Sequence, residues 1–109
     1  MSSDSQDAGV KPTVGVRHDL LTLVRMCQII GDGDKALLQK KAASCPEISI
    51  QRLLVDGGYV REATVDSLEL GQLLIAQGLI KETQFCVGMY DEMTTGITMK
   101  DSLKTRGWL

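Results

Sequence analysis

The sequence predicts an all-α fold, a compact bundle of five to six short helices built from helix–glycine–helix hairpins. The main observation is a pattern that occurs three times, at 50–60, 70–80 and 99–109. Each copy begins with an apolar residue and has mostly apolar residues three and four positions later. A glycine then comes four positions after the second of these. Such positions lie on one face of a helix, so each copy indicates an amphipathic helix with a sharp stop. An aromatic content of 4% further indicates an aliphatic core.

The glycines Gly58, Gly78 and Gly107 are expected to end their helices in the left-handed conformation, which a residue with a Cβ adopts only at a cost. This ending, the Schellman turn, brings helix residue C3 against residue C″ beyond the helix. The pairs expected to touch in this way are Leu54 with Tyr59, Leu74 with Leu79, and Leu103 with Trp108. The glycines are 20 and 29 residues apart, and this irregular spacing favours hairpins that share one core over an open solenoid.

Periodicity and capping residues predict six helices, at about 16–30, 35–44, 46–56, 62–77, 82–93 and 98–107. Asp34 is expected to be the N-cap of the second helix. Cys45 is expected to be the N-cap of the third helix, with Pro46 at its first position. Thr98 and Asp101 resemble a capping box that opens the last helix.

The helix at 62–77 has the broadest apolar surface, and we expect it to lie at the centre of the domain. Gly71 inside it costs about 1 kcal/mol relative to alanine, and the usual compensation is the close approach of another backbone. We therefore predict a packing notch at Gly71. In the next helix Phe85 and Met89 should be buried, with Cys86 and Met93 as further candidates for burial, and Gly88 should permit a close contact. The residues expected to form one buried cluster are Leu20, Val24, Leu54, Leu73, Leu74 and Leu103.

A chain of 109 residues has the size of a single domain. Residues 1–15 are polar and rich in helix breakers, and we expect a disordered leader or linker there, ahead of one helical domain at 16–109. No apolar run is long enough for a membrane span, and no signal peptide is evident. The three cysteines, Cys27, Cys45 and Cys86, lack metal-site spacing and are expected to be free thiols of a cytoplasmic protein.

No catalytic, cofactor or metal site is predicted, and we do not expect an enzyme. His18 is the single histidine, and it has no ligand partner at the required spacing. Asp32 and Asp34 lie in a Gly-Asp-Gly-Asp turn, but the further oxygen ligands of a calcium loop do not follow. No phosphate-binding loop is present, and no nucleophile can be paired with a base. The formal charge of −2 provides no basic patch for nucleic acid.

The stretch 70–92 resembles the N-terminal domain of type II secretion and type IV pilus assembly ATPases. Within that group it is most similar to the MshEN domain, which binds cyclic di-GMP. The residues that match the family pattern are Leu70, Gly71, Leu73, Leu74, Gly78, Leu79, Ile80 and Phe85. The resemblance covers about 23 residues well and extends loosely through the flanking copies. It implies a helical domain with a regulatory or protein-binding role.

Two departures from the family pattern concern the ligand. Glu69 stands where the family has an arginine, and Glu92 stands where it has a closing glutamine. An arginine donates paired hydrogen bonds to guanine or phosphate, whereas a carboxylate only accepts hydrogen bonds and repels phosphate. The degenerate ligand-motif positions are Glu69, Leu70, Gly71, Gly78 and Glu92. We therefore expect that the domain does not bind cyclic di-GMP.

The sequence is compatible with three functional hypotheses, of which the first is preferred. The first is a non-catalytic module with a protein-interaction or regulatory role. Its partner is another protein or a second copy of the chain. The second is a cyclic dinucleotide sensor that uses residues outside the family motif, which a pocket lined by Arg52 or Arg61 would favour. The third, a helix-turn-helix DNA-binding domain, is disfavoured by the acidic balance and by the lack of a basic helix. An exposed apolar patch would favour the first hypothesis.

Overall fold

The computed structural model describes residues 16–109, and that range contains six α-helices and no strand, so the predicted all-α bundle is confirmed. The predicted leader at 1–15 lies outside the described residues. The helices are α1 (Leu20–Met26), α2 (Asp32–Ser44), α3 (Ile50–Asp56), α4 (Glu62–Ala76), α5 (Glu82–Thr95) and α6 (Met99–Thr105).

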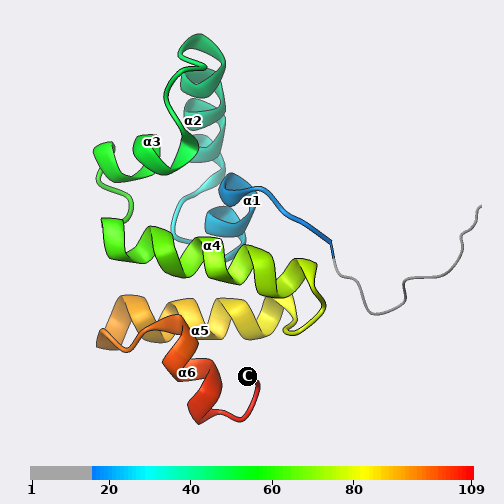
Figure 1. Cartoon of the computed structure of the whole chain (residues 1–109). Coiled ribbons are helices and arrows are strands. Elements are labelled where there is room, and N and C mark those ends of the chain that lie inside the picture. Colours follow the sequence, from blue (N-terminus) through cyan, green and yellow to red (C-terminus); the bar gives the residue numbers. More distant parts are fainter. Residues whose placement is uncertain (1–15) are drawn as a thin grey trace, which may run out of the picture.

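Helix α4 lies at the centre of the arrangement (Figure 1). It packs against α1 on one side and against the antiparallel helix α5 on the other. Helix α6 folds back onto α5, while α2 and α3 form an arm next to α1. One continuous cluster of apolar side chains holds these elements together. Its buried members are Leu20, Leu21, Leu23, Val24, Ile30, Leu38, Leu54, Val60, Leu68, Leu74, Ile75, Ile80, Phe85, Met89, Met99 and Leu103.

Leu73 is the one residue of the predicted core that is not buried, because 45% of its surface is exposed. The buried face of α4 follows Thr64, Leu68, Gly71 and Ile75, at spacings of three and four residues. Leu73 lies two residues from Gly71, which places it about 200° around the helix, on the far side. The prediction for Leu73 was therefore wrong.

The helix stops have the geometry expected from the repeated pattern. Gly58, Gly78 and Gly107 have φ values of +77°, +73° and +77°. At Gly58 the N–H of Tyr59 donates to the carbonyl of Leu54 at 3.0 Å, which is the bond from C″ to C3 of a Schellman turn. The equivalent bonds follow Gly78 and Gly107 at 2.9 Å. Each stop thus satisfies a helix-end carbonyl that would otherwise lack a partner.

A fourth copy of the stop lies at 20–30, and sequence analysis missed it because a glutamine replaces the glycine. Gln28 has φ +62°, the one positive value at a non-glycine residue among residues 16–109. The N–H of Ile29 donates to the carbonyl of Val24 at 2.9 Å, as in the other three stops. Helix α1 therefore ends in the same turn as α3, α4 and α6.

With this fourth copy the chain divides into two equivalent halves, 20–60 and 70–109. The first half contains α1, α2 and α3; the second contains the end of α4, then α5 and α6. Within the halves the stops are 30 and 29 residues apart, and the 20-residue interval from Gly58 to Gly78 is the junction that α4 spans. The spacing that looked irregular in the sequence is therefore an alternation produced by an internal repeat.

The helix starts show where local prediction was wrong. Asp34 is not the N-cap of α2; Gly31 is, and the Asp34 carboxylate instead accepts a hydrogen bond from the Gly31 N–H at 3.2 Å. Cys45 and Pro46 do not begin α3, because that helix starts at Ile50.

The N-cap of α3 is Ser49, whose hydroxyl accepts a hydrogen bond from the N–H of Arg52 at 3.1 Å. Helix α1 also begins later than expected, with Asp19 as its N-cap. Serine and aspartate are among the preferred N-cap residues, which accounts for where both helices begin. Thr98 is the N-cap of α6, as predicted, because its hydroxyl accepts a hydrogen bond from the N–H of Asp101.

Candidate functional site

Helix α5 has one buried face and one strongly exposed face. Phe85 and Met89 point into the core and are fully buried. On the other face Tyr90 is 68% exposed, the largest fraction for any large apolar or aromatic side chain of residues 16–109, and Met93 is 45% exposed. Tyr90 and Met93 are three residues apart and therefore share one side of the helix. An aromatic ring and a thioether thus stand next to each other on the surface.

Two surface hollows flank Tyr90. One has a volume of about 360 Å³ and lies between the end of α1 and the sides of α5 and α6. The other has a volume of about 410 Å³ and lies between the end of α1, the turn after α3 and the last turns of α5. Both hollows are lined by Cys27, Gln28 and Tyr90. We call the combined depression the Tyr90 groove; its other lining residues are Met26, Ile29, Tyr59, Cys86, Val87, Met89, Asp91, Met93 and Arg106.

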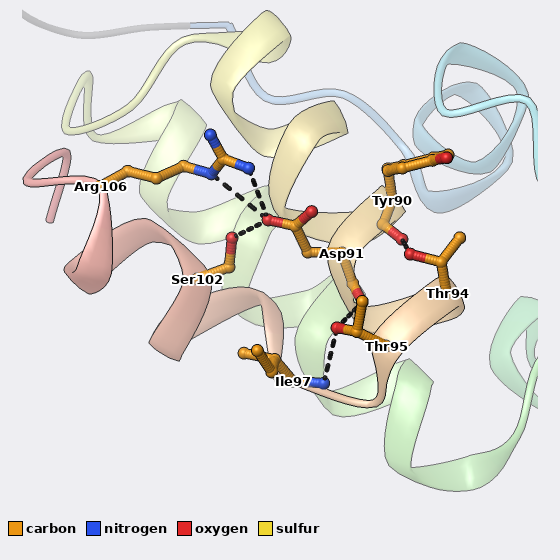
Figure 2. A network of polar contacts seen from close by, with 7 residues as sticks. All are labelled: Tyr90, Asp91, Thr94, Thr95, Ile97, Ser102 and Arg106. Atoms are coloured by element: carbon orange, nitrogen blue, oxygen red, sulfur yellow. Dashed lines mark hydrogen bonds and ion pairs between the residues drawn. The ribbon is translucent and has the colours of Figure 1, made fainter.

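A polar network holds α6 against α5 at one end of the Tyr90 groove (Figure 2). The Asp91 carboxylate accepts hydrogen bonds from the Ser102 hydroxyl and from the Arg106 guanidinium, with its Oδ2 atom 2.9 Å from Arg106 Nη2. Tyr90 projects from the other side of the same helical turn. The guanidinium of Arg106 also lies 5.4 Å from the centre of the Trp108 ring. These contacts fix the wall of the groove that α6 provides.

The last turn of α5 is held by its own threonines. The hydroxyl of Thr94 donates to the carbonyl of Tyr90 at 2.7 Å, and the hydroxyl of Thr95 donates to the carbonyl of Asp91 at 2.6 Å. Gly96 then ends the helix with φ +81°. The carbonyls of Tyr90 and Asp91 thus accept hydrogen bonds from the threonines one turn further along the helix.

Two ionisable groups of the groove have shifted pKa values. Hydrogen bonds from Ser102 and Arg106 lower the pKa of Asp91, so this carboxylate stays charged and paired. Burial raises the pKa of the Cys27 thiol well above its usual value, and the neighbouring Cys86 raises it further. The Sγ atoms of Cys27 and Cys86 are 3.5 Å apart.

The degenerate ligand-motif positions have structural surroundings and do not converge on one site. Glu69 is exposed and accepts a hydrogen bond from the Gln51 side chain at 2.9 Å. Leu70 packs against the core, and Gly78 ends α4. Gly71 faces the ring of Phe85, so the predicted notch receives a side chain where we expected a backbone.

Glu92, the fifth motif position, is buried between three helices. Only 7% of its surface is exposed. Its Oε1 atom accepts hydrogen bonds from the Ser67 hydroxyl on α4 and from the N–H of Met99 at the start of α6, at 2.5 and 2.7 Å. A glutamine, the family residue, could accept the same two bonds. Glu92 therefore joins α4, α5 and α6 from the interior.

A third hollow, of about 270 Å³, contains Arg52, which the sensor hypothesis had singled out. Its other lining residues include Glu62 and Asp66. The Arg52 guanidinium forms ion pairs with Asp56 at 3.3 Å and with Glu62 at 3.6 Å. The positive charge is thus already matched by carboxylates, which makes the hollow a poor site for an anionic ligand.

His18 has a structural partner. Its Nε2 atom lies 3.0 Å from a carboxylate oxygen of Glu82 at the start of α5, and this contact lowers the pKa of Glu82. Residues 16–109 contain no group of three or more His, Cys, Asp or Glu side chains placed to hold a metal ion. Within the same range, no helix has the length and apolar character that a membrane crossing requires.

Sequence reasoning missed both central features of the Tyr90 groove. The exposure of Tyr90 and Met93 follows from the rotation of α5, which Phe85 sets by packing into the notch at Gly71. The contact between Cys27 and Cys86 joins residues that are 59 positions apart. Only the odd number of cysteines was visible in the sequence.

The secretion-ATPase resemblance has no further support from known proteins and stays a prediction. Comparison of the chain with family models, with curated proteins and with solved structures found no match in any of the three.

Proposed function

We propose that this chain is a non-catalytic protein-interaction module whose Tyr90 groove binds an apolar segment of a partner protein. The observation that carries the proposal is the exposed Tyr90 ring between two hollows, with Met93 beside it. Tyrosine and methionine are enriched at protein interfaces, and tyrosine is common among the residues that dominate binding energy. Both expose large contact areas without a charge that binding would have to desolvate.

The composition of the groove indicates the chemistry of the partner segment. Asp91 and Arg106 are the two charged residues among those that line the groove, and they pair with each other. The remaining surface is formed by sulfur-containing, aliphatic and aromatic side chains and by Gln28. Flexible methionines adapt to apolar side chains of different shape. An amphipathic helix with two apolar side chains one turn apart, one on each side of Tyr90, matches this surface.

The test is a capture experiment with matched variants. The full chain is immobilised as wild type, as Tyr90→Ala and as Leu37→Ala, and each is exposed to the same native lysate. Leu37 lies on α2 and is also substantially exposed, so its loss controls for a general decrease in surface hydrophobicity. We expect a protein that wild type and Leu37→Ala retain and that Tyr90→Ala loses by at least tenfold, the effect of about 1.4 kcal/mol. Circular dichroism checks that all three variants fold.

Measurement of peptide affinity then tests whether the Tyr90 groove is the binding site. A peptide from the captured protein is titrated against the same three variants, with Met93→Ala added as a fourth. If the groove is the binding site, Tyr90→Ala and Met93→Ala both weaken binding while Leu37→Ala does not. Equal retention by wild type and Tyr90→Ala would instead place the interaction elsewhere on the molecule. A concentration-dependent dimer lost in Tyr90→Ala would make the partner a second copy of the chain.

The cyclic dinucleotide sensor is the second candidate, and one feature favours it, the presence of Arg52 in a surface hollow. The two carboxylates paired with Arg52 count against it. A cytoplasmic location stays a prediction of the sequence.

A further inference from the structure

Two cysteines from distant parts of the chain meet at the floor of the Tyr90 groove. Cys27 is the C-cap residue of α1, and Cys86 lies in the second turn of α5. The Cys27 thiol donates a hydrogen bond to the sulfur of Cys86 over 3.5 Å. The third cysteine, Cys45, is the C-cap of α2, in the arm formed by α2 and α3. The three thiols are therefore one close pair and one separate residue.

We propose that Cys27 and Cys86 are an oxidative modification site, at which a peroxide converts the two thiols into an intramolecular disulfide. A disulfide has an S–S length of about 2.0 Å, so the sulfurs have to approach by about 1.5 Å. Rotation of the two side chains can supply a movement of this size. The fully buried neighbours, Val24 on α1 and Phe85 on α5, hold the two backbones in place while the sulfurs approach.

An oxidant can reach the pair because both sulfurs belong to residues that line the hollow of about 360 Å³. Both cysteines are partly buried. This intermediate exposure admits a molecule as small as hydrogen peroxide and hinders a second protein molecule. Disulfide formation between two copies of the chain through these residues is therefore disfavoured relative to closure within one chain.

The reaction balances with hydrogen peroxide as the oxidant. The Cys86 sulfur, as thiolate, attacks one peroxide oxygen, the O–O bond breaks, and the departing oxygen leaves as water after taking a proton, which produces a sulfenic acid. The Cys27 sulfur then attacks the Cys86 sulfur, the S–S bond forms, and the sulfenic oxygen leaves as a second water with the Cys27 proton. Two thiols lose two electrons, and the peroxide gains them.

The surroundings disfavour Cys27 as the first sulfur to react. Burial raises the pKa of its thiol, and the thiolate is the nucleophile toward peroxide. Cys27 lies within hydrogen-bond distance of Cys86, so it is placed to act as the resolving thiol.

The disulfide would join the first half of the chain to the second. Cys27 follows α1 in the first half, and α5 lies in the second half. The new bond would close a loop that spans 59 positions, and loops of this length strongly restrict the unfolded chain. Oxidation should therefore raise the melting temperature of the protein by several degrees.

The test uses the full chain with Cys45→Ser, which leaves only the pair. The reduced protein is treated with hydrogen peroxide, and intact mass, free thiols and melting temperature are measured. We expect a mass loss of two hydrogens, the disappearance of both thiols together, a higher melting temperature, and full reversal by dithiothreitol. Mapping of the digested product should find Cys27 linked to Cys86.

Cys27→Ser and Cys86→Ser, each in the Cys45→Ser background, serve as controls. Neither can close the bond, so oxidation should add oxygen to the remaining sulfur or couple two chains. The proposal is overturned if the protein with the intact pair keeps both thiols, gains oxygen atoms without losing hydrogens, or forms only intermolecular dimers. Circular dichroism of the untreated variants confirms that all of them start from the same fold. The result does not depend on whether the Tyr90 groove binds a partner.

Discussion

The ring of Phe85 occupies the space that a side chain on Gly71 would need. A Cβ built on Gly71 would lie 2.1 Å from Cε1 of Phe85, far inside any van der Waals contact. This relationship fixes the distance between α4 and α5 and the rotation of α5 about its axis. It explains why a glycine is placed inside the central helix despite its conformational cost.

Gly71→Ala should therefore destabilise the protein by about 1–3 kcal/mol or more, the range for overpacked cores, although alanine favours the helix. Gly33→Ala in α2 is the matched control, because no atom lies within 4 Å of its added Cβ. We expect Gly33→Ala to be neutral or to stabilise by up to about 1 kcal/mol. Urea unfolding measures both variants. Equal effects at the two positions would show that Phe85 can move aside freely.

Gln28→Gly should stabilise the protein by about 1 kcal/mol, since Gln28 is held at φ +62° and a left-handed backbone costs a non-glycine residue about 1–2 kcal/mol. Gly58→Gln, at the equivalent stop, should destabilise by a similar amount. No atom lies within 4 Å of a Cβ added at Gly58, so its cost comes from the backbone alone. Thermal and urea unfolding of both variants check the pair. A stabilising Gly58→Gln would contradict the equivalence of the two stops.

The parts of the fold that could be predicted from sequence are those that local geometry decides. The glycine stops and the extents of α4 and α5 depend on residues close in the chain, and the sequence analysis placed them well. The stop at Gln28 was missed because glutamine carries no signal for a left-handed backbone. Leu73 was wrongly predicted to be buried because it occupies an apolar position of the repeated pattern. Which face of α4 is turned toward the core is decided by the contact between Gly71 and Phe85.

The candidate site could not be predicted for the same reason. Tyr90 reads as an ordinary helix residue until the rotation of α5 is known. The cysteine pair requires the end of α1 to reach α5, which depends on how both helices pack around α4. Contacts between distant residues leave no periodic signal in a single sequence.

Glu92→Ala should destabilise the protein by about 1–3 kcal/mol, because it leaves the buried N–H of Met99 and the Ser67 hydroxyl without their acceptor. Glu92→Gln keeps an oxygen that can accept both bonds, so we expect a change below about 1 kcal/mol. Glu69→Ala controls for the loss of an exposed carboxylate and should have little effect. Urea unfolding at neutral pH distinguishes the three. Equal losses for alanine and glutamine at position 92 would mean that the charge, and not the acceptor, is required.

The free energy of unfolding should decrease at acidic pH, partly because the Asp91 carboxylate becomes protonated. Ser102 and Arg106 lower the pKa of this carboxylate in the folded protein, so the unfolded chain binds a proton more readily. The stabilisation is therefore complete above the unfolded pKa, at about pH 4, and is lost as the pH falls through the lower folded pKa. Asp91→Asn should be less stable than wild type at pH 6, and the difference should narrow toward pH 3. Denaturant unfolding across this range is the measurement; a constant difference would exclude Asp91 as a contributor.

The protein should not bind cyclic di-GMP at micromolar concentration. Glu69 replaces the arginine of the family motif and already accepts a hydrogen bond from Gln51, while Glu92 is buried and bonded to Ser67 and Met99. Neither position can donate to a phosphate or a guanine, and Glu69 adds a negative charge. The loss of two charge-assisted hydrogen bonds costs about 1.5–3 kcal/mol each, which weakens a micromolar site by roughly two to four decades.

Titration calorimetry at micromolar protein concentration checks this expectation. Wild type should produce only heat of dilution. Saturable heat would instead support the sensor hypothesis, and Arg52→Ala would then test whether the hollow beside Glu62 is the site. Arg52 already pairs with Asp56 and Glu62. An anionic ligand therefore has to compete with these two carboxylates of the same chain for the Arg52 guanidinium. That competition, together with the acidic replacements in the motif, is the physical reason to expect no binding.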